Sequence, residues 1–234
     1  MNRNFSILLV AQFLTAFADN AILFTAIAMI LQSGSQGGWY VPALQGSFLV
    51  AFVLLAPWVG PFADSRPKAK VLTVANIIKA VGAVMMLSQV DPLIAYAVVG
   101  IGAAMYSPAK YGILPELVPH DQRVRVNGWI EGSTILAILA GSMVGSWIAD
   151  YSIAAALWMV IILYAVSSFA TLFIEMIPPR IHERVAALPN FIRMTRRLLQ
   201  TSRARFATLG VSLFWGAAVG LRVMLVAWAP AVLA

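Results

Sequence analysis

Five ionisable side chains interrupt stretches of this sequence that are otherwise apolar. They are Asp19, Lys79, Lys110, Glu131 and Arg222. An isolated charge at the centre of a bilayer costs about 2.5–3.5 kcal/mol on insertion scales, so each needs a partner, a proton or a water-filled cavity. Two of the five are acids and three are bases, which leaves one excess positive charge. A phosphodiester would neutralise that charge, so the set suits a phosphate-bearing ligand.

Asp19 is the strongest candidate for a functional residue. It lies about 21 Å along a helix from Phe5, at about 1.5 Å per residue, which places it near the middle of a membrane span. The sequence leaves three roles open: an ion-pair gate with Arg222, contact with a ligand amine, and a purely structural pair. Asn20 faces another direction on the helix, where its amide can bond a backbone carbonyl or a ligand.

Lys110, Tyr111 and Arg222 complete the predicted binding set. Lys110 follows Pro108, whose missing N–H loosens a helix and frees a carbonyl. Its ammonium then either binds phosphate or extends to the membrane interface. Tyr111 either contacts the ligand or belongs to the interfacial aromatic belt. The Arg222 guanidinium suits bidentate binding of phosphate or carboxylate.

Lys79 and Glu131 are the two remaining charges within the predicted spans. Lys79 lies about 13 Å along its helix from Lys70, and Glu131 lies about 6 Å along its helix from Asn127, at about 1.5 Å per residue. Both are therefore predicted to reach the membrane interface and to be structural.

The elements that position these residues are predicted to be membrane-spanning helices. The chain has 234 residues, of which 61% are hydrophobic and only 11% are charged. A soluble domain has nearer one quarter charged residues. Seven continuous apolar stretches each reach the roughly 20 residues that a spanning helix needs. They are Phe5–Leu31, Val41–Phe62, Val71–Val90, Leu93–Leu117, Gly128–Ala149, Ile153–Ile177 and Phe206–Ala234. The predicted fold class is therefore an all-α polytopic membrane protein.

Composition also limits the chemistry. The chain has no cysteine, which excludes disulfides, zinc–thiolate sites and cysteine catalysis. No metal cluster, catalytic constellation or cofactor fingerprint appears, so we expect neither an enzyme nor a bound cofactor. The net charge of +7 comes from short links beside the spans. We interpret it as a topology signal, and we expect no nucleic-acid partner.

The links between the spans alternate in charge. Links with Lys or Arg follow the second, fourth and sixth stretches, whereas the other links have none. The positive-inside bias therefore predicts a cytoplasmic N-terminus. The long link Pro178–Arg205 mixes arginines with apolar residues at helical spacing. It is either an amphipathic segment on the anionic leaflet or a solvated connector.

Three regions follow from this pattern. Residues 1–177 are predicted to form a six-helix bundle, and residues 178–205 a basic cytoplasmic linker. Residues 206–234 are predicted to be the first helix of a second bundle. Because Ala234 lies within an apolar run, we expect this chain to be a partial one.

One link carries a recognisable motif. Gly60, Asp64, Arg66, Lys68 and Lys70 have the spacing Gly-x-x-x-Asp-x-Arg-x-Lys-x-Lys. Gly60 is predicted to allow close helix approach, and Asp64 to bond a helix N-terminus or a base. The motif resembles the loop between the second and third helices of the major facilitator superfamily. That resemblance implies that the motif gates a conformational change and does not contact substrate. The alternative interpretation is an ordinary basic loop on the cytoplasmic side.

Four further stretches resemble the bacterial lysophospholipid transporter family, a branch of that superfamily. They are Ala11–Ala21, Tyr106–Leu114, Asn127–Thr134 and Ser212–Arg222. The resemblance implies a major facilitator fold that moves lysophosphatidylethanolamine and lysophosphatidylglycerol across the bacterial inner membrane. The lipids would reach the cytoplasmic leaflet, where a partner acyltransferase/acyl-carrier-protein synthetase restores the second chain.

Two rival functions remain open at this point. The first is a proton-coupled exporter of small solutes or drugs from the same superfamily, with Asp19 as the proton carrier. The second is an integral membrane acyltransferase, against which the missing His–Asp constellation argues.

Overall fold

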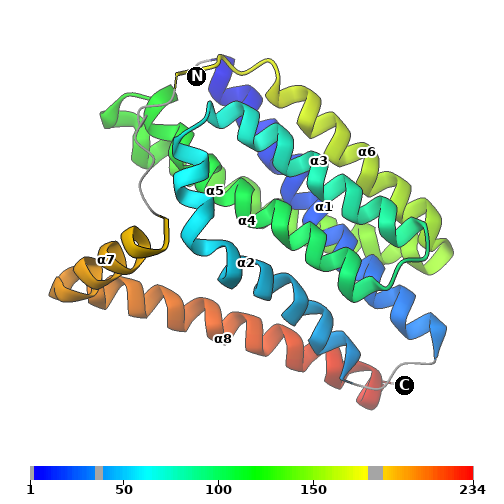
Figure 1. The fold of residues 1–234 in the computed structure, drawn as a ribbon. Helices are drawn as coiled ribbons and strands as arrows, with labels where there is room; N and C mark the ends of the chain where they lie inside the picture. The colour runs from blue at the N-terminus through cyan, green and yellow to red at the C-terminus, as the bar shows by residue number, and fades with distance from the viewer. Residues whose placement is uncertain (1–2, 35–38, 179–186, 234) are drawn as a thin grey trace.

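The computed structural model describes residues 3–34, 39–178 and 187–233, and every regular element within them is helical. In chain order the elements are α1 (Arg3–Ser33), α2 (Tyr40–Asp64), α3 (Lys68–Leu87), α4 (Pro92–Leu117), a short 3-10 turn η1 (His120–Gln122), α5 (Arg123–Tyr151), α6 (Ile153–Thr171), α7 (Ala187–Gln200) and α8 (Ser202–Leu233) (Figure 1).

Seven of these helices are long and apolar enough to cross a membrane, so the prediction of seven spans is confirmed. The sixth is shorter than predicted, because α6 ends at Thr171 rather than at Ile177. Beyond Thr171 the backbone tightens into turns, in which the amides of Leu172 and Phe173 bond carbonyls three residues earlier. Residues 179–186 of the predicted linker, and Ala234, lie outside the described residues.

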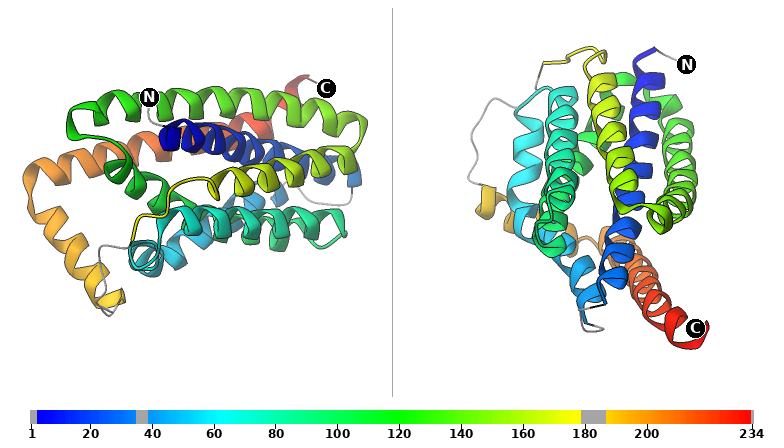
Figure 2. Two further views of the ribbon diagram at one scale, coloured as in Figure 1. Left: turned by 90° about the horizontal axis from the view of Figure 1, so that it is seen from above. Right: turned by 90° about the vertical axis from the view of Figure 1, so that its right-hand side faces the viewer.

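The first six helices pack as one bundle around α1. This helix lies against α5 on one side and α6 on another, while α4 packs between α2 and α3 (Figure 2). Two links are fixed by capping. Asp91 accepts a hydrogen bond from the Leu93 amide at 2.8 Å, with Pro92 in the first turn, and Ser152 accepts from Ala155 at 3.2 Å. These caps start α4 and α6 after short links from the preceding helices.

The close contact between α1 and α5 depends on two glycines. A Cβ on Gly145 would lie 2.6 Å from the Ala21 Cα, and one on Gly141 would meet the Phe17 carbonyl. Both glycines therefore allow these membrane helices to pack closely. The close helix approach predicted at Gly60 is wrong, because a Cβ there would meet nothing within 4 Å, and the same is true of Gly132. Those two glycines lie on helix faces that no neighbour in the described chain covers.

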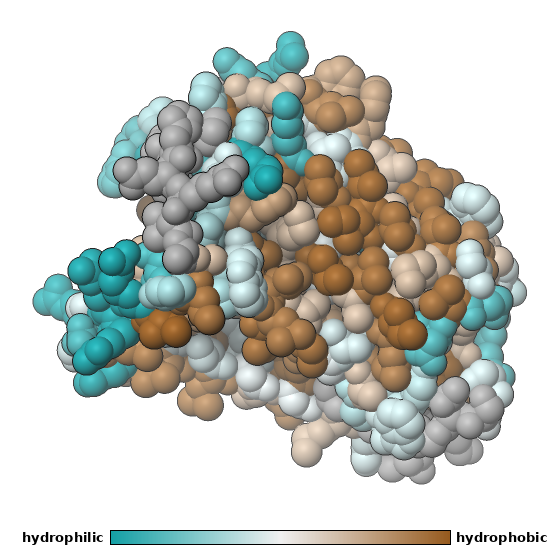
Figure 3. All heavy atoms as spheres, in the orientation of Figure 1, coloured by the Kyte–Doolittle hydropathy of each residue, from teal (hydrophilic) through white to brown (hydrophobic). Residues whose placement is uncertain are grey.

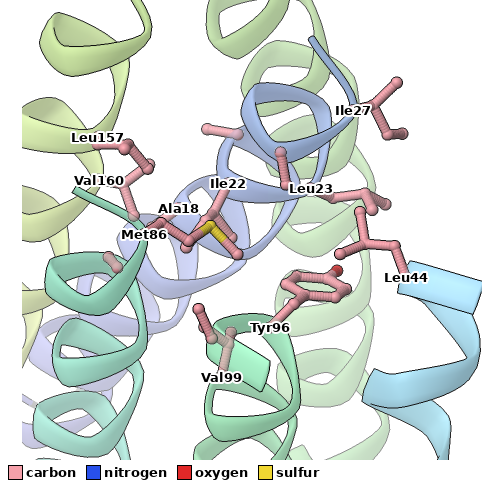
Figure 4. Close-up of a cluster of buried hydrophobic side chains, with 14 of the residues drawn as sticks. Ala18, Ile22, Leu23, Ile27, Leu44, Met86, Tyr96, Val99, Leu157 and Val160 are labelled. Atoms are coloured by element: carbon pink, nitrogen blue, oxygen red, sulfur yellow. The ribbon is translucent and has the colours of Figure 1, made fainter. Parts of the chain in front are cut away.

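Two apolar clusters fill the two ends of the bundle. In one, Ile22 and Leu23 of α1 pack with Met86, Tyr96 and Leu157 (Figure 4). The other gathers buried side chains near the beginning of α1, including Phe5, Leu8, Leu72, Ile113 and Ile130. Buried polar groups lie between them, among them Thr15, Asn76 and Ser167. The bundle therefore has a polar layer at mid-depth.

The outside of the bundle is apolar between polar ends. Figure 3 shows hydrophobic side chains over the middle of the visible face and hydrophilic ones toward its ends. The N-terminus and the links after α2, α4 and α6 gather at one end of the molecule (Figure 1). Because the helices alternate in direction, the basic links share that end.

Candidate functional site

A pocket of about 210 Å³ opens at mid-depth in the bundle. It is lined by side chains of five helices, α1 to α5: Gln12, Thr15, Ala16, Asp19, Asn20, Phe48, Phe52, Lys79, Ala103, Tyr106, Ser107, Lys110, Tyr111, Thr134 and Ile138. Four of the five residues predicted to bind a ligand are in this set. Phe48, Phe52 and Ile138 supply an apolar wall beside the charged groups.

Asp19 is held by two partners in the pocket. Its Oδ2 accepts a hydrogen bond from Lys79 Nζ at 2.8 Å, and its Oδ1 accepts one from the Tyr164 hydroxyl at 2.8 Å. The Lys79 side chain is 1% exposed, whereas that of Asp19 is 26% exposed. The carboxylate thus faces the pocket while its counter-ion is enclosed by protein. Such a pair is kept in low dielectric only when both charges are matched.

The prediction that Lys79 reaches the membrane interface is wrong. Its stem passes over Gly102 of α4, where an added Cβ would lie 2.6 Å from Lys79 Cγ. Its ammonium lies 4.7 Å from the centre of the Tyr106 ring, a cation–π contact. The side chain therefore turns inward because α4 offers a glycine and an aromatic face at that level.

The partner predicted for Asp19 was Arg222. Arg222 is on α8, but its side chain lies outside the described residues. The Asp19–Arg222 gate and phosphate binding by Arg222 therefore remain predictions.

A buried network of hydroxyls and one amide supports the ion pair. Asn76 Nδ2 donates to Thr15 Oγ1 at 3.0 Å and to Ser167 Oγ at 2.9 Å. Ser167 in turn donates to the Ala11 carbonyl at 2.8 Å. Thr15 precedes Asp19 by one helical turn, and Asn76 precedes Lys79 by nearly one, so each shares a face with a charged residue. The network joins α1, α3 and α6 and so fixes the two charges relative to each other.

Sequence reasoning missed this network. The sequence does contain a signal for this network, because a polar residue precedes each charge by about one helical turn inside an apolar span. These residues are Thr15 before Asp19 and Asn76 before Lys79. Polar side chains at helix spacing in a membrane span usually bond across helices.

Lys110 supplies a second cation to the pocket. The residue is 7% exposed, so it is enclosed by the bundle rather than extended to the outer surface. Its ammonium lies 4.4 Å from the centre of the Tyr111 ring. Among the ion pairs of the described residues, none within 4.0 Å includes Lys110. The pocket therefore holds one matched charge pair and one cation that makes no ion pair within 4.0 Å among the described residues.

Asn20 and Tyr111 are already engaged. The Asn20 amide donates to the Ala16 carbonyl one turn earlier at 2.8 Å. The Tyr111 hydroxyl donates to Glu131 Oε1 at 2.9 Å, which joins α4 to α5. Both residues still line the pocket, where a ligand has to compete with these bonds.

Gln12 is a pocket residue that the sequence did not identify. Its Nε2 donates to Thr134 Oγ1 at 3.1 Å, while Thr134 donates its own hydrogen to the Ile130 carbonyl at 2.7 Å. That second bond fixes the amide orientation, because Thr134 can then only accept from Gln12. The Gln12 Oε1 atom is buried and has no hydrogen-bond partner among the described residues.

The loop motif forms a separate charged site at the basic end. Lys68 Nζ lies 2.8 Å from Glu116 Oε1 and 3.8 Å from Asp64 Oδ1, and the side chain is 7% exposed. A Cβ on Gly112 would lie 2.7 Å from Lys68 Cε, so α4 leaves space for this lysine.

The remaining bases of the motif are exposed. Arg66 packs over the Phe62 ring at 4.0 Å, and Lys70 faces outward. Asp64 does bond a base, as predicted, but the acid Glu116 that completes the site was not recognised in the sequence. The gating role of the motif stays a prediction.

A bundle of spanning helices with a matched charge pair and a polar pocket at mid-depth is an arrangement that membrane transporters commonly have. Residues 8–234 match the Major Facilitator Superfamily, and the chain belongs to that family.

Named relatives agree with this assignment. The chain is 43% identical over 237 residues to the lysophospholipid transporter LplT of Photorhabdus laumondii. It is 42% identical over 242 residues to proteins of the same name from Yersinia pestis (strain Pestoides F) and Yersinia pseudotuberculosis (strain YPIII). All of this chain is covered, against 58–59% of each relative's length. The chain thus spans about three fifths of the relatives that it matches.

Proposed function

We propose that this chain is the N-terminal portion of a lysophospholipid transporter of the bacterial inner membrane. Its substrates would be lysophosphatidylethanolamine and lysophosphatidylglycerol, moved to the cytoplasmic leaflet for reacylation by a partner acyltransferase/acyl-carrier-protein synthetase. The basic end, which carries the N-terminus, would face the cytoplasm. The names of the relatives support the substrate class, and the pocket supports it independently.

The observation that carries the proposal is the Lys110 ammonium in a pocket that already contains a matched pair, since no ion pair within 4.0 Å among the described residues includes this ammonium. A phosphate at Lys110 would give it a direct ionic partner. An ethanolamine ammonium would fit the exposed side of Asp19, which still has accepting capacity. Phe48, Phe52 and Ile138 would pack against the glycerol and the first methylenes of the acyl chain.

Transport in this proposal needs no covalent chemistry. The lipid would move because the bundle and its counterpart alternate access to a fixed site. The motif around Lys68 would restrain that motion at the cytoplasmic end, since its ion pairs with Asp64 and Glu116 join α2 and α3 to α4.

A proton-coupled exporter of small solutes is the second candidate. The observation in its favour is Asp19 itself, a partly exposed carboxylate that faces the pocket and is paired with Lys79. In that case flux would depend on the proton gradient and not on lipid substrates.

Uptake of radiolabelled lysophosphatidylethanolamine tests the proposal. Spheroplasts without a lysophospholipid carrier would express the chain together with any coding sequence that continues it. The parent would be compared with Asp19→Ala and Arg222→Ala at equal membrane levels. We expect uptake by the parent and a loss of at least tenfold in Asp19→Ala.

The outcomes separate the two candidates. No lipid uptake by a well-expressed parent, together with a pH-driven solute flux, would refute lipid transport and support the exporter. Full uptake in Asp19→Ala would keep the function and exclude this carboxylate from the site. A loss in Arg222→Ala would add α8 to the binding site.

A further inference from the structure

Helix α7 carries a second surface that the transport pocket does not use. At about 100° per residue, its apolar side chains cover an arc of about 160°. They are Ala187, Leu188, Phe191, Ile192, Met194, Leu198 and Leu199, with Thr195 as the one polar side chain among them. The opposite arc of about 120° holds Pro189, Asn190, Gln200 and all three arginines of the helix, Arg193, Arg196 and Arg197.

The other described residues leave the apolar arc exposed. Every side chain from Phe191 to Gln200 is exposed, including Ile192 at 58% and Leu198 at 46%. The backbones of α7 and α2 come close to each other, but the side chains of this face stay exposed. Exposed apolar side chains on a helix with a clean basic face are typical of helices that lie within a membrane interface.

The position of α7 agrees with such a role. It runs crosswise to the long axis of the bundle, at the end that carries the basic links (Figure 2, left). The spanning helices define the membrane normal, so a crosswise helix at their end lies along the membrane surface. Two further arginines, Arg203 and Arg205, follow in the first turns of α8 and are exposed.

We propose that α7 is an interfacial anchor that binds the anionic lipid surface of the leaflet at the basic end. Its apolar arc lies among the upper acyl chains, and Arg193, Arg196 and Arg197 contact lipid phosphates. Each arginine near an anionic leaflet adds to the attraction, and the effect decays within a Debye length. The anchor requires insertion of the bundle in a membrane but is independent of the transported substrate.

Single cysteines test this placement, because the chain has none of its own. Spin labels at Ile192→Cys and Leu199→Cys would report the apolar arc, and labels at Asn190→Cys and Gln200→Cys the polar arc. None of these changes removes an arginine. The whole chain would be reconstituted in vesicles of phosphatidylcholine with or without phosphatidylglycerol, and accessibility to oxygen and to a water-soluble nickel chelate would be measured.

We expect labels at Ile192 and Leu199 to meet oxygen and avoid nickel in the anionic vesicles, and the polar pair to show the reverse. An Arg193→Gln, Arg196→Gln, Arg197→Gln variant should lower the ratio of inserted to free α7 about tenfold or more in those vesicles. It should have little effect in phosphatidylcholine alone. Gln keeps high helix propensity, so circular dichroism should confirm equal helix content.

Two results would overturn the proposal. Apolar-arc labels hidden from both reagents in both vesicles would show that protein covers α7, either a second copy or a further part of the same protein. Equal insertion of α7 in vesicles with and without phosphatidylglycerol would show that its arginines do not bind anionic lipid preferentially. Neither result would affect the uptake test of the proposed function.

Discussion

At the scale of single residues, the pocket contains one ion pair and one separate cation. Asp19 and Lys79 neutralise each other at 2.8 Å, while Lys110 stands apart on α4. A binding site for a zwitterionic head group needs such an asymmetry, because a fully paired site offers nothing to a phosphate. The pair would also keep Lys79 from competing with Lys110 for the ligand.

Removing one member of the Asp19–Lys79 pair should destabilise the protein more than removing both. Breaking a fully buried pair costs about 3–5 kcal/mol, and less is expected here because Asp19 is 26% exposed. Asp19→Asn and Lys79→Met should therefore each lower the melting temperature in detergent, and the double variant should recover most of the loss. We expect the double variant to remain inactive in lysolipid uptake. Normal uptake by the stable double variant would show that the pair is purely structural.

Replacing Lys110 should lower the affinity for lysolipid without lowering the stability of the protein. Hydrogen bonds to charged groups contribute about 1.5–3 kcal/mol, so Lys110→Gln should weaken lysolipid binding about 10- to 150-fold. Lys110→Arg should keep part of the affinity, since the charge remains. Lys70→Gln is the matched control, because it removes the same charge from an exposed side chain that does not line the pocket. Binding to the purified protein in nanodiscs measures all three, and equal losses in Lys110→Gln and Lys70→Gln would argue against a phosphate contact.

Sequence alone identified the charges but not their pairing. Asp19, Asn20, Lys110 and Tyr111, which all line the pocket, could be singled out because charges and their neighbours are conspicuous in apolar spans. The partner of Asp19 was not found, because it depends on the rotation of α3 and on the approach of α4 at Gly102. Those are properties of helix packing, which a pattern along one chain does not contain. Glu116 and Gln12 were missed for the same reason.

At the scale of elements, the bundle is set by where helices can approach closely. Helix α5 reaches α1 through Gly141 and Gly145, and α4 reaches α3 through Gly102. The spans and their order were predictable from apolar length and link charge. Which glycine makes a contact was not, because Gly132 and Gly145 look alike in sequence and differ only in the face they occupy.

Gly145→Ala and Gly132→Ala should therefore have opposite effects on stability. The alanine methyl at residue 145 would meet the Ala21 backbone at 2.6 Å, and such overpacking costs about 1–3 kcal/mol. At residue 132 a methyl meets nothing, and replacing glycine within a helix gains up to about 1 kcal/mol. Thermal unfolding of the two variants in the same detergent measures the difference. A stabilised Gly145→Ala would contradict the close contact between α1 and α5.

At the scale of the whole molecule, one asymmetry organises the chain. The basic links after α2 and α4 and the arginines of α7 lie at the end that holds the N-terminus, and the apolar exterior separates that end from the other. The charged links and the crosswise amphipathic helix indicate the same membrane plane. The pocket lies at mid-depth relative to that plane. The orientation across the membrane therefore decides from which side the pocket is filled.

The proposed orientation can be measured with two serines that close successive helices. Ser65 is the C-cap of α2 at the basic end, and Ser88 is the C-cap of α3 at the opposite end. Both are exposed, and serine to cysteine is nearly isosteric. Because the parent has no cysteine, each variant carries a single reactive thiol. A membrane-impermeant maleimide added to intact spheroplasts should label Ser88→Cys and leave Ser65→Cys unlabelled until the membrane is opened. The reverse pattern would put the basic end outside, and the direction of lipid movement proposed above would then be wrong.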